Sequence, residues 1–132
     1  MTAALDVSGC LEILLQKEKS ENFGKALKAA NLVVAPDLYV PELTNTLWKY
    51  CRAGFLSQDE CMQYIRDGIN YVDKFIDCRD LWQEAFSEGL NNNYSVYDMF
   101  YMVVARRYGG ALITCDSVLA TVCRKYGIQI GE

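Results

Sequence analysis

The sequence predicts a three-layer α/β/α fold with a central, mainly parallel sheet of about four to five strands. Short apolar runs of the kind found in buried strands alternate with longer amphipathic segments. This alternation is typical of a parallel sheet that is covered by helices on both faces. The chain has 132 residues, of which 52% are hydrophobic, so one core can form without disulfides or metal staples. We therefore expect a single domain over residues 1–132.

The first predicted strand covers residues 3–7 and is apolar apart from Asp6. A helix with a leucine stripe follows directly, and either Asp6 or Ser8 can cap it. However, a buried acid is costly without a partner, and ligands of open parallel sheets bind at the carboxyl ends of strands. The position of Asp6 therefore favours a functional role.

The second predicted helix covers residues 23–30, where apolar side chains recur at the i, i+3, i+4, i+7 spacing. The continuous apolar run 32–35 follows as a central strand, and Pro36 ends it. A third helix is predicted over residues 40–51, because Pro41 suits a first helical turn and an apolar stripe follows it.

Three polar residues share one face of this third helix. Glu42, Asn45 and Lys49 are three and four residues apart, so their side chains lie above one another. Two interpretations of Glu42 remain open. It is either an ordinary first-turn acid favoured by the helix dipole or a member of a functional site.

The middle of the chain is predicted to contain a helix opened by the capping box Ser57-x-x-Glu60, a short strand near residues 72–76, and a helix over residues 78–90. Apolar spacing also predicts which side chains these two helices bury. The expected core stripes are Met62, Ile65, Ile69 and Val72 in the first helix, and Leu81, Trp82, Ala85, Phe86 and Leu90 in the second.

The stretch over residues 94–118 is the centre around which the other elements are arranged. Residues 96–108 are apolar on nearly every helical face, which indicates a helix buried on more than one side. A glycine pair ends this helix, because glycine adopts the left-handed conformation of a C-cap without strain. A strand over residues 111–113 then leads to Thr114 and Asp116.

Asp98 and Asp116 each have a structural alternative. Ser95 and Asp98 fit a capping box, and Asp116 can be the N-cap of a helix over residues 118–126. Taken one at a time, capping explains these acids at least as well as chemistry does. The last apolar residues, 128–130, are expected to supply a final strand.

Composition excludes several classes of site. The six cysteines form no CxxC pair and the chain has no histidine, which disfavours zinc sites and His-activated nucleophiles. The net charge of −4 argues against a protein that coats nucleic acid by charge alone, but not against an enzyme that holds cations. No signal-peptide pattern and no apolar run of about 20 residues is present. We therefore expect a soluble, cytoplasmic protein without a membrane segment.

Four acids occupy comparable positions at the ends of predicted elements. Asp6 and Asp116 follow strands, whereas Glu42 and Asp98 lie in first helical turns. Four caps directed into one crevice would be a coincidence. Clustered carboxylates without imidazole or thiolate suit hard, oxygen-seeking ions such as Mg²⁺ or Mn²⁺. The pattern suggests metal-assisted phosphodiester chemistry.

The whole chain resembles the PIN-domain ribonucleases, and within them the VapC-like toxins of prokaryotic toxin–antitoxin pairs. The resemblance rests on four segments in order, LDVSG, PELTNTLWK, YSVYDMFYMVVARRYGGALITCD and the closing KYGIQI. There are two mild departures. Met99 stands where a small residue often follows the family's helix aspartate, and Cys115 separates Thr114 from Asp116.

The resemblance implies a PIN-like fold and an endoribonuclease that uses Mg²⁺ or Mn²⁺ and leaves a 5′-phosphate and a 3′-hydroxyl. The implied catalytic and metal-binding set is Asp6, Glu42, Asp98 and Asp116, with Ser8, Asn45 and Thr114 as polar neighbours. The candidates for contacts to the RNA backbone are Lys49, Arg52, Arg106 and Arg107. Solvated surface charge is the alternative for each of these basic residues. A small antitoxin protein and a homodimer are the implied partners.

Two other functions compete with this hypothesis. The first is a catalytically silent PIN-fold module that keeps the acids as caps for binding or regulation. The second is an aspartyl-phosphate phosphohydrolase, which is disfavoured because no second aspartate stands two residues after Asp6. No glycine-rich phosphate loop precedes a helix either. A carboxylate-metal nuclease therefore explains the pattern best.

Overall fold

A computed structural model describes residues 1–131 and confirms the predicted α/β class. Four strands, seven α-helices and one short 3₁₀ helix occur in this range. In chain order they are β1 (Thr2–Leu5), α1 (Val7–Leu14), α2 (Ser20–Ala29), β2 (Leu32–Pro36), α3 (Tyr39–Arg52), α4 (Gln58–Asn70), β3 (Lys74–Ile76), η1 (Cys78–Asp80), α5 (Trp82–Asn92), α6 (Val96–Tyr108), β4 (Ala111–Ile113) and α7 (Ser117–Lys125).

The sheet has the strand order β3-β2-β1-β4, and every pair is parallel. Ala4 of β1 pairs with Val34 of β2 on one side and with Leu112 of β4 on the other. Because the carboxyl ends of parallel strands lie at one edge of the sheet, the residues that follow β1 and β4 meet there. This topology brings Asp6 and Asp116 together across about 110 residues of sequence.

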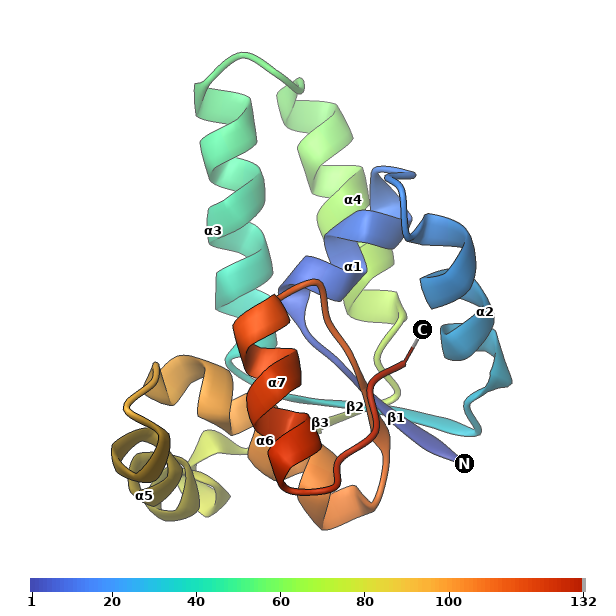
Figure 1. Cartoon of the computed structure of the whole chain (residues 1–132). Helices are drawn as coiled ribbons and strands as arrows, with labels where there is room; N and C mark the ends of the chain where they lie inside the picture. Colours follow the sequence, from blue (N-terminus) through green and yellow to red (C-terminus); the bar gives the residue numbers. More distant parts are fainter. Residues whose placement is uncertain (132) are drawn as a thin grey trace.

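Helices cover both faces of the sheet, as predicted. In Figure 1, α1, α2 and α4 lie on one face, whereas α5, α6 and α7 lie on the other. Helices α3 and α4 pack against each other as a hairpin that projects away from the sheet.

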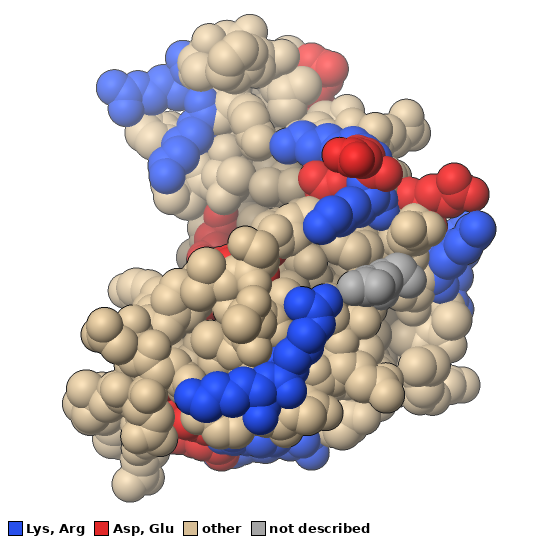
Figure 2. All heavy atoms as spheres, viewed as in Figure 1, with Lys and Arg blue, Asp and Glu red and all other residues tan. Residues whose placement is uncertain are grey.

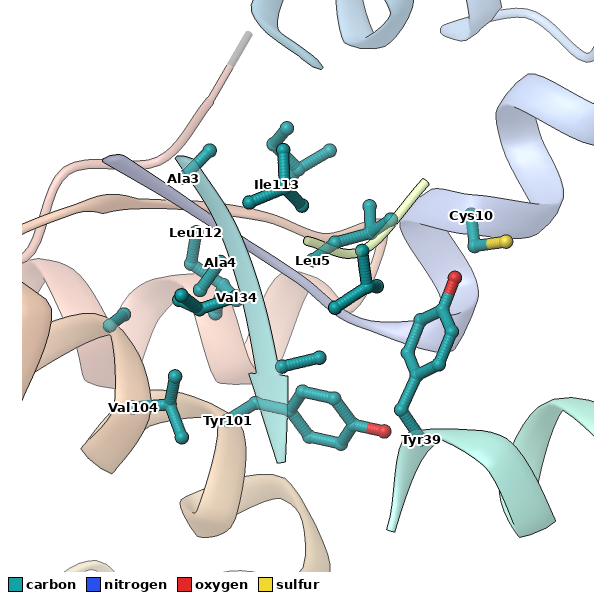
Figure 3. Packing of buried hydrophobic residues seen from close by; sticks show 14 of the residues in the cluster. Ala3, Ala4, Leu5, Cys10, Val34, Tyr39, Tyr101, Val104, Leu112 and Ile113 are labelled. Atoms are coloured by element: carbon teal, nitrogen blue, oxygen red, sulfur yellow. The ribbon is translucent and has the colours of Figure 1, made fainter. Parts of the chain in front are cut away.

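The core includes residues of the sheet and of the helices that cover it, and α6 supplies a large part of it. Met99, Met102, Val103 and Val104 are fully buried, which confirms the prediction of a helix that is buried on several sides. Figure 3 shows Val104 of α6 beside Ala4 of β1, Val34 of β2 and Leu112 of the edge strand β4. The left-handed Gly109 ends α6 with φ 62°, as the glycine pair predicted.

The predicted core stripe of the helix over residues 78–90 is wrong in part. Leu81 and Ala85 are buried, but Trp82 is 57% exposed, Phe86 54% and Leu90 70%. Compared with the prediction, α5 is rotated about its axis, so that its polar side faces α6. There, Glu84 and Glu88 both accept hydrogen bonds from Arg106, at 2.7 and 2.5 Å.

Three smaller predictions also need correction. Met62 is exposed on α4, where the buried positions are held by Cys61 and Gly68. The predicted last strand over residues 128–130 is reduced to an isolated bridge between Ile130 and Leu112. The capping box that Ser57 and Glu60 predict is present, whereas Ser95 makes no side-chain cap at the start of α6.

Within residues 1–131, no helix combines the length and apolar character that crossing a membrane requires. All six cysteines are free thiols.

Candidate active site

The four predicted acids line a single pocket of about 410 Å³ at the carboxyl edge of the sheet. Its walls come from the loops after β1 and β4 and from the first turns of α3 and α6. The polar residues that line it are Asp6, Ser8, Glu42, Asn45, Thr46, Lys49, Asp98, Tyr101 and Asp116. Figure 2 shows acidic side chains in a hollow between α3 and the helices on the other side of the sheet.

Asp6 is the most buried of the four acids, with 5% exposure. It is the N-cap of α1, because one of its oxygens accepts from the Gly9 backbone N–H at 2.8 Å and from Ser8 Oγ at 2.7 Å. The other oxygen accepts from Thr114 Oγ1 at 2.5 Å. Burial, with a smaller contribution from the charge of Asp98, raises the pKa of Asp6 to about 6 despite these donors.

Ser8 and Thr114 tie the end of β1 to the end of β4. Their hydroxyl oxygens are 3.2 Å apart. Ser8 Oγ accepts from the backbone N–H of Cys115 at 2.8 Å, and Thr114 Oγ1 accepts from that of Asp116 at 3.0 Å. The two hydroxyls therefore fix the position of Asp6 relative to the segment that carries Asp116.

Asp116 is held from two directions. It caps α7, where Oδ1 accepts from the backbone N–H groups of Val118 and Leu119 at 3.0 Å each. The Tyr94 hydroxyl donates to Oδ1 at 3.1 Å and to Oδ2 at 2.9 Å. Asp6 and Asp116 are thus both caps and pocket residues, so the two interpretations of these acids are compatible.

Glu42 and Asp98 reach the pocket from helices. The Tyr101 hydroxyl donates a short hydrogen bond to Glu42. Burial raises the pKa of Glu42, and the charge of Asp98 adds to this effect. Burial also raises the pKa of Asp98, and the neighbouring charge of Asp116 is the next cause. Asp98 is thus the acid whose charge acts on Asp6 and on Glu42 and on which the charge of Asp116 acts in turn.

Tyr94 and Tyr101 are site residues that the sequence reasoning missed. Together with Asp98 they stand at positions i, i+4 and i+7 on one side of α6 and of the turn before it. In Figure 3 the Tyr101 ring points from α6 toward the start of α3, where Tyr39 lies. The i, i+4, i+7 spacing around Asp98 is the signal that identifies them.

The donor chemistry of the pocket fits a hard divalent cation. Its ligand groups are carboxylates and the Asn45 amide, which are oxygen donors of the kind Mg²⁺ and Mn²⁺ prefer. In residues 1–131, however, no group of three or more acids or thiols is already gathered as a metal-ligand set. The carboxylates line one pocket without converging on a single point.

The four predicted basic contacts divide into two pairs. Lys49 lines the pocket, and Arg52 follows one turn later on α3. Arg106 is bonded to Glu84 and Glu88, and Arg107 to Glu84 at 3.2 Å, between α5 and α6. Of these four basic residues, the structure places only Lys49 in the lining of the acidic pocket.

A parallel α/β/α sheet with carboxylates after two neighbouring strands is the arrangement that the resemblance to PIN domains implies. No family model matches the sequence. The chain is 30% identical over 122 residues to Ribonuclease VapC3 of Pyrobaculum aerophilum, which covers 91% of this chain and 93% of that protein. The chain therefore belongs to the VapC-like family of PIN-domain ribonucleases.

The fold agrees with a solved structure from the same organism. The crystal structure of PAE2754 from Pyrobaculum aerophilum superposes with a TM-score of 0.73 at 19% sequence identity. The match covers 92% of this chain and 79% of that chain. This likeness shows the fold, and it extends over nearly all of the described residues.

Proposed function

We propose that the protein is a metal-dependent endoribonuclease that hydrolyses RNA phosphodiester bonds and acts as the toxin of a toxin–antitoxin pair. The observation that carries this proposal is the meeting of Asp6, Glu42, Asp98 and Asp116 in one pocket. They come from four separate segments of the chain. Membership of the family supports ribonuclease activity, and the set of carboxylates supports a metal-dependent reaction.

In this mechanism the protein would bind and orient the cation and attract the RNA phosphate, and it needs no nucleophile of its own. Asp6, Glu42, Asp98 and Asp116 would hold Mg²⁺ or Mn²⁺, which supplies activation of water and neutralisation of phosphate charge. Ser8 and Thr114 keep Asp6 in place.

The remaining polar groups of the pocket support this carboxylate set. Tyr94 and Tyr101 fix the carboxylates of Asp116 and Glu42 through their hydroxyls. Lys49 provides a positive charge at the same pocket for an incoming phosphate.

The decisive test is cleavage of a labelled structured RNA in Mg²⁺, Mn²⁺ or EDTA. We expect cleavage by the wild type with either metal and none in EDTA. Asp6→Asn and Asp98→Asn should lose it, whereas Asp59→Asn, an exposed first-turn acid of α4, should cleave like the wild type. Absence of cleavage by the wild type with both metals contradicts the proposal.

A catalytically silent PIN-fold module is the second candidate. The observation in its favour is that the acids in residues 1–131 are not gathered into a ligand set of three. A silent module should bind no Mn²⁺ in a calorimetric titration. A nuclease should bind it, and Asp98→Asn should weaken that binding.

We further propose that a small antitoxin protein and a second copy of the chain are partners of this single cytoplasmic domain. An arginine of the antitoxin would pair with the pocket carboxylates and exclude the metal. Addition of the cognate antitoxin should therefore abolish both cleavage and Mn²⁺ binding. Sedimentation velocity tests the homodimer, and a monomer at all concentrations argues against it.

A further inference from the structure

The outer side of α3 carries one aromatic and two basic side chains directly beside the carboxylate pocket. We call Asn45, Trp48, Lys49 and Arg52 the α3 face. All four are exposed, whereas the opposite side of the helix packs into the core. Their spacing of three and four residues places them next to one another on the helix surface.

The α3 face begins inside the pocket and leads out of it. Asn45 and Lys49 line the pocket together with the four acids. An α-helix rises about 1.5 Å per residue, so Arg52 lies about 10 Å further along the axis than Asn45. The α3 face therefore offers a path over Trp48 and Arg52 to an extended chain that is held at the pocket by one phosphate.

Trp48 is a large aromatic side chain that the fold leaves about half exposed. It is 52% exposed, although burying an aromatic ring is among the most favourable contributions a side chain can make. The Arg52 guanidinium lies over one face of this ring, 5.2 Å from its centre. A base that stacks on Trp48 therefore takes the other ring face or displaces the guanidinium, which is then free to contact the phosphate of the same nucleotide.

The positive charges of the α3 face are available to a ligand. Among residues 1–131, no carboxylate forms an ion pair with Lys49 or Arg52, in contrast to Arg106 and Arg107. Figure 2 shows basic side chains on the projecting α3 side of the hollow, above the acids. Cations that flank an aromatic ring match a nucleotide, which offers a flat base and an anionic phosphate.

We propose that the α3 face is a subsite for single-stranded RNA, in which Trp48 stacks on an unpaired base next to the scissile phosphate. Lys49 and Arg52 contact the flanking phosphates. This inference rests on the proposed nuclease function and names the form of RNA that the site takes. A stacking platform accepts unpaired bases, because the ring faces of paired bases are hidden in a duplex.

The first experiment measures the Kd of a labelled single-stranded oligoribonucleotide in EDTA, where cleavage does not interfere. Trp48→Ala should raise the Kd roughly 5- to 100-fold, and Trp48→Phe by less. Trp82→Ala is the matched control, because Trp82 is similarly exposed, at 57%, on α5. Trp82→Ala should bind RNA like the wild type. Sedimentation checks that all variants have the same oligomeric state.

Tryptophan fluorescence gives an independent readout, because the chain has only two tryptophans. In a Trp82→Phe protein, RNA should quench the emission of Trp48. In a Trp48→Phe protein, the emission of Trp82 should remain unchanged. Lys49→Gln and Arg52→Gln should each lower the slope of log K against log salt by about one, whereas exposed Lys28→Gln of α2 should not.

The outcomes separate this inference from the proposed function. If the wild type cleaves RNA, and Trp48→Ala binds RNA as tightly as the wild type does, only the inference is overturned. The α3 face is then assigned to a protein contact. Equal affinity for a duplex and a single strand also overturns it. If the wild type cleaves no RNA but Trp48→Ala binds RNA more weakly than the wild type, the subsite is supported and the proposed nuclease function is contradicted.

Discussion

The hydroxyl of Tyr94 donates to both carboxylate oxygens of Asp116, at 3.1 and 2.9 Å. Burial, followed by this hydrogen bond to a carboxylate, raises the pKa of Tyr94 to about 12. The tyrosine is therefore a neutral donor throughout the physiological range. It lies just before α6, and thus connects the helix that carries Asp98 to the cap of α7.

Removing this hydroxyl should weaken the metal site. We expect Tyr94→Phe to lower Mn²⁺ affinity roughly 10-fold, because a carboxylate loses the donor that orients it toward the pocket. The affinity is measured by calorimetric titration. Tyr97→Phe, one position before Asp98 and 66% exposed, should bind Mn²⁺ like the wild type. Tighter binding by Tyr94→Phe would mean that the tyrosine competes with the metal.

Thr114 tests the cost of leaving a buried carboxylate oxygen without a donor. Thr114→Val keeps the shape of the side chain but removes the hydroxyl that donates to Asp6. We expect a loss of about 1–3 kcal/mol in the free energy of unfolding. Chemical denaturation in EDTA measures it. Thr114→Ser retains the hydroxyl and should recover most of the loss, so equal losses in the two variants would point to packing.

Asp98 should cost stability in the absence of metal. Asp98→Asn removes one of several crowded charges, and we expect an unchanged or slightly higher Tm in EDTA. Burial and the charge of Asp116 both act against the ionised Asp98. Asp116→Ala is the contrast, since it deletes the cap of α7 and should cost roughly 1 kcal/mol. A drop of many degrees for Asp98→Asn would show that capping outweighs repulsion.

Much of the fold was predictable because apolar periodicity and turn residues are local signals. Gly109 ends α6 and Ser57 opens α4 as expected, and the two central strands lie where the apolar runs predicted. The four acids that line the pocket were also singled out from the sequence, since they directly follow strands or open helices, and their catalytic role stays a prediction. The meeting of Asp6 with Asp116 itself depends on the strand order β2-β1-β4, which one sequence does not specify.

The errors arose where tertiary contacts overrode local pattern. Helix α5 has an apolar side and a polar side, and either could face α6. The polar side faces α6, because Glu84 and Glu88 form ion pairs with Arg106 there. Tyr94 and Tyr101 were missed for a related reason, since their partners are distant in sequence.

The rotation of α5 changes the expected effect of a substitution. Had Trp82 been a core residue, Trp82→Ala would cost on the order of 3–5 kcal/mol. Its observed exposure of 57% predicts a loss below about 1 kcal/mol instead. Thermal denaturation measures this, and Leu47→Ala, at a fully buried position of α3, should lose about 2–5 kcal/mol in the same experiment.

The burial of Asp6 predicts a pH dependence of opposite sign to that of an ordinary salt-bridged acid. Its pKa is about 6 in the folded protein against 3.8 for an unperturbed aspartate, so the folded state binds more protons between these values. The Asp6 contribution to stability is therefore greatest below about pH 4 and falls as the pH rises to about 6. The loss is on the order of 3 kcal/mol.

The contribution of Asp6 is isolated by comparing the wild type with Asp6→Asn in EDTA. Other acids oppose it, since the pKa of Glu88 is lowered by hydrogen bonds from Arg106, Asn91 and Tyr126 despite partial burial. The Tm difference between the two proteins should shift in favour of Asp6→Asn as the pH rises from 4 to 6. A saturating divalent ion should reverse this shift, because a bound cation stabilises the ionised carboxylate. A difference that stays constant over this range would show that Asp6 is already ionised at pH 4.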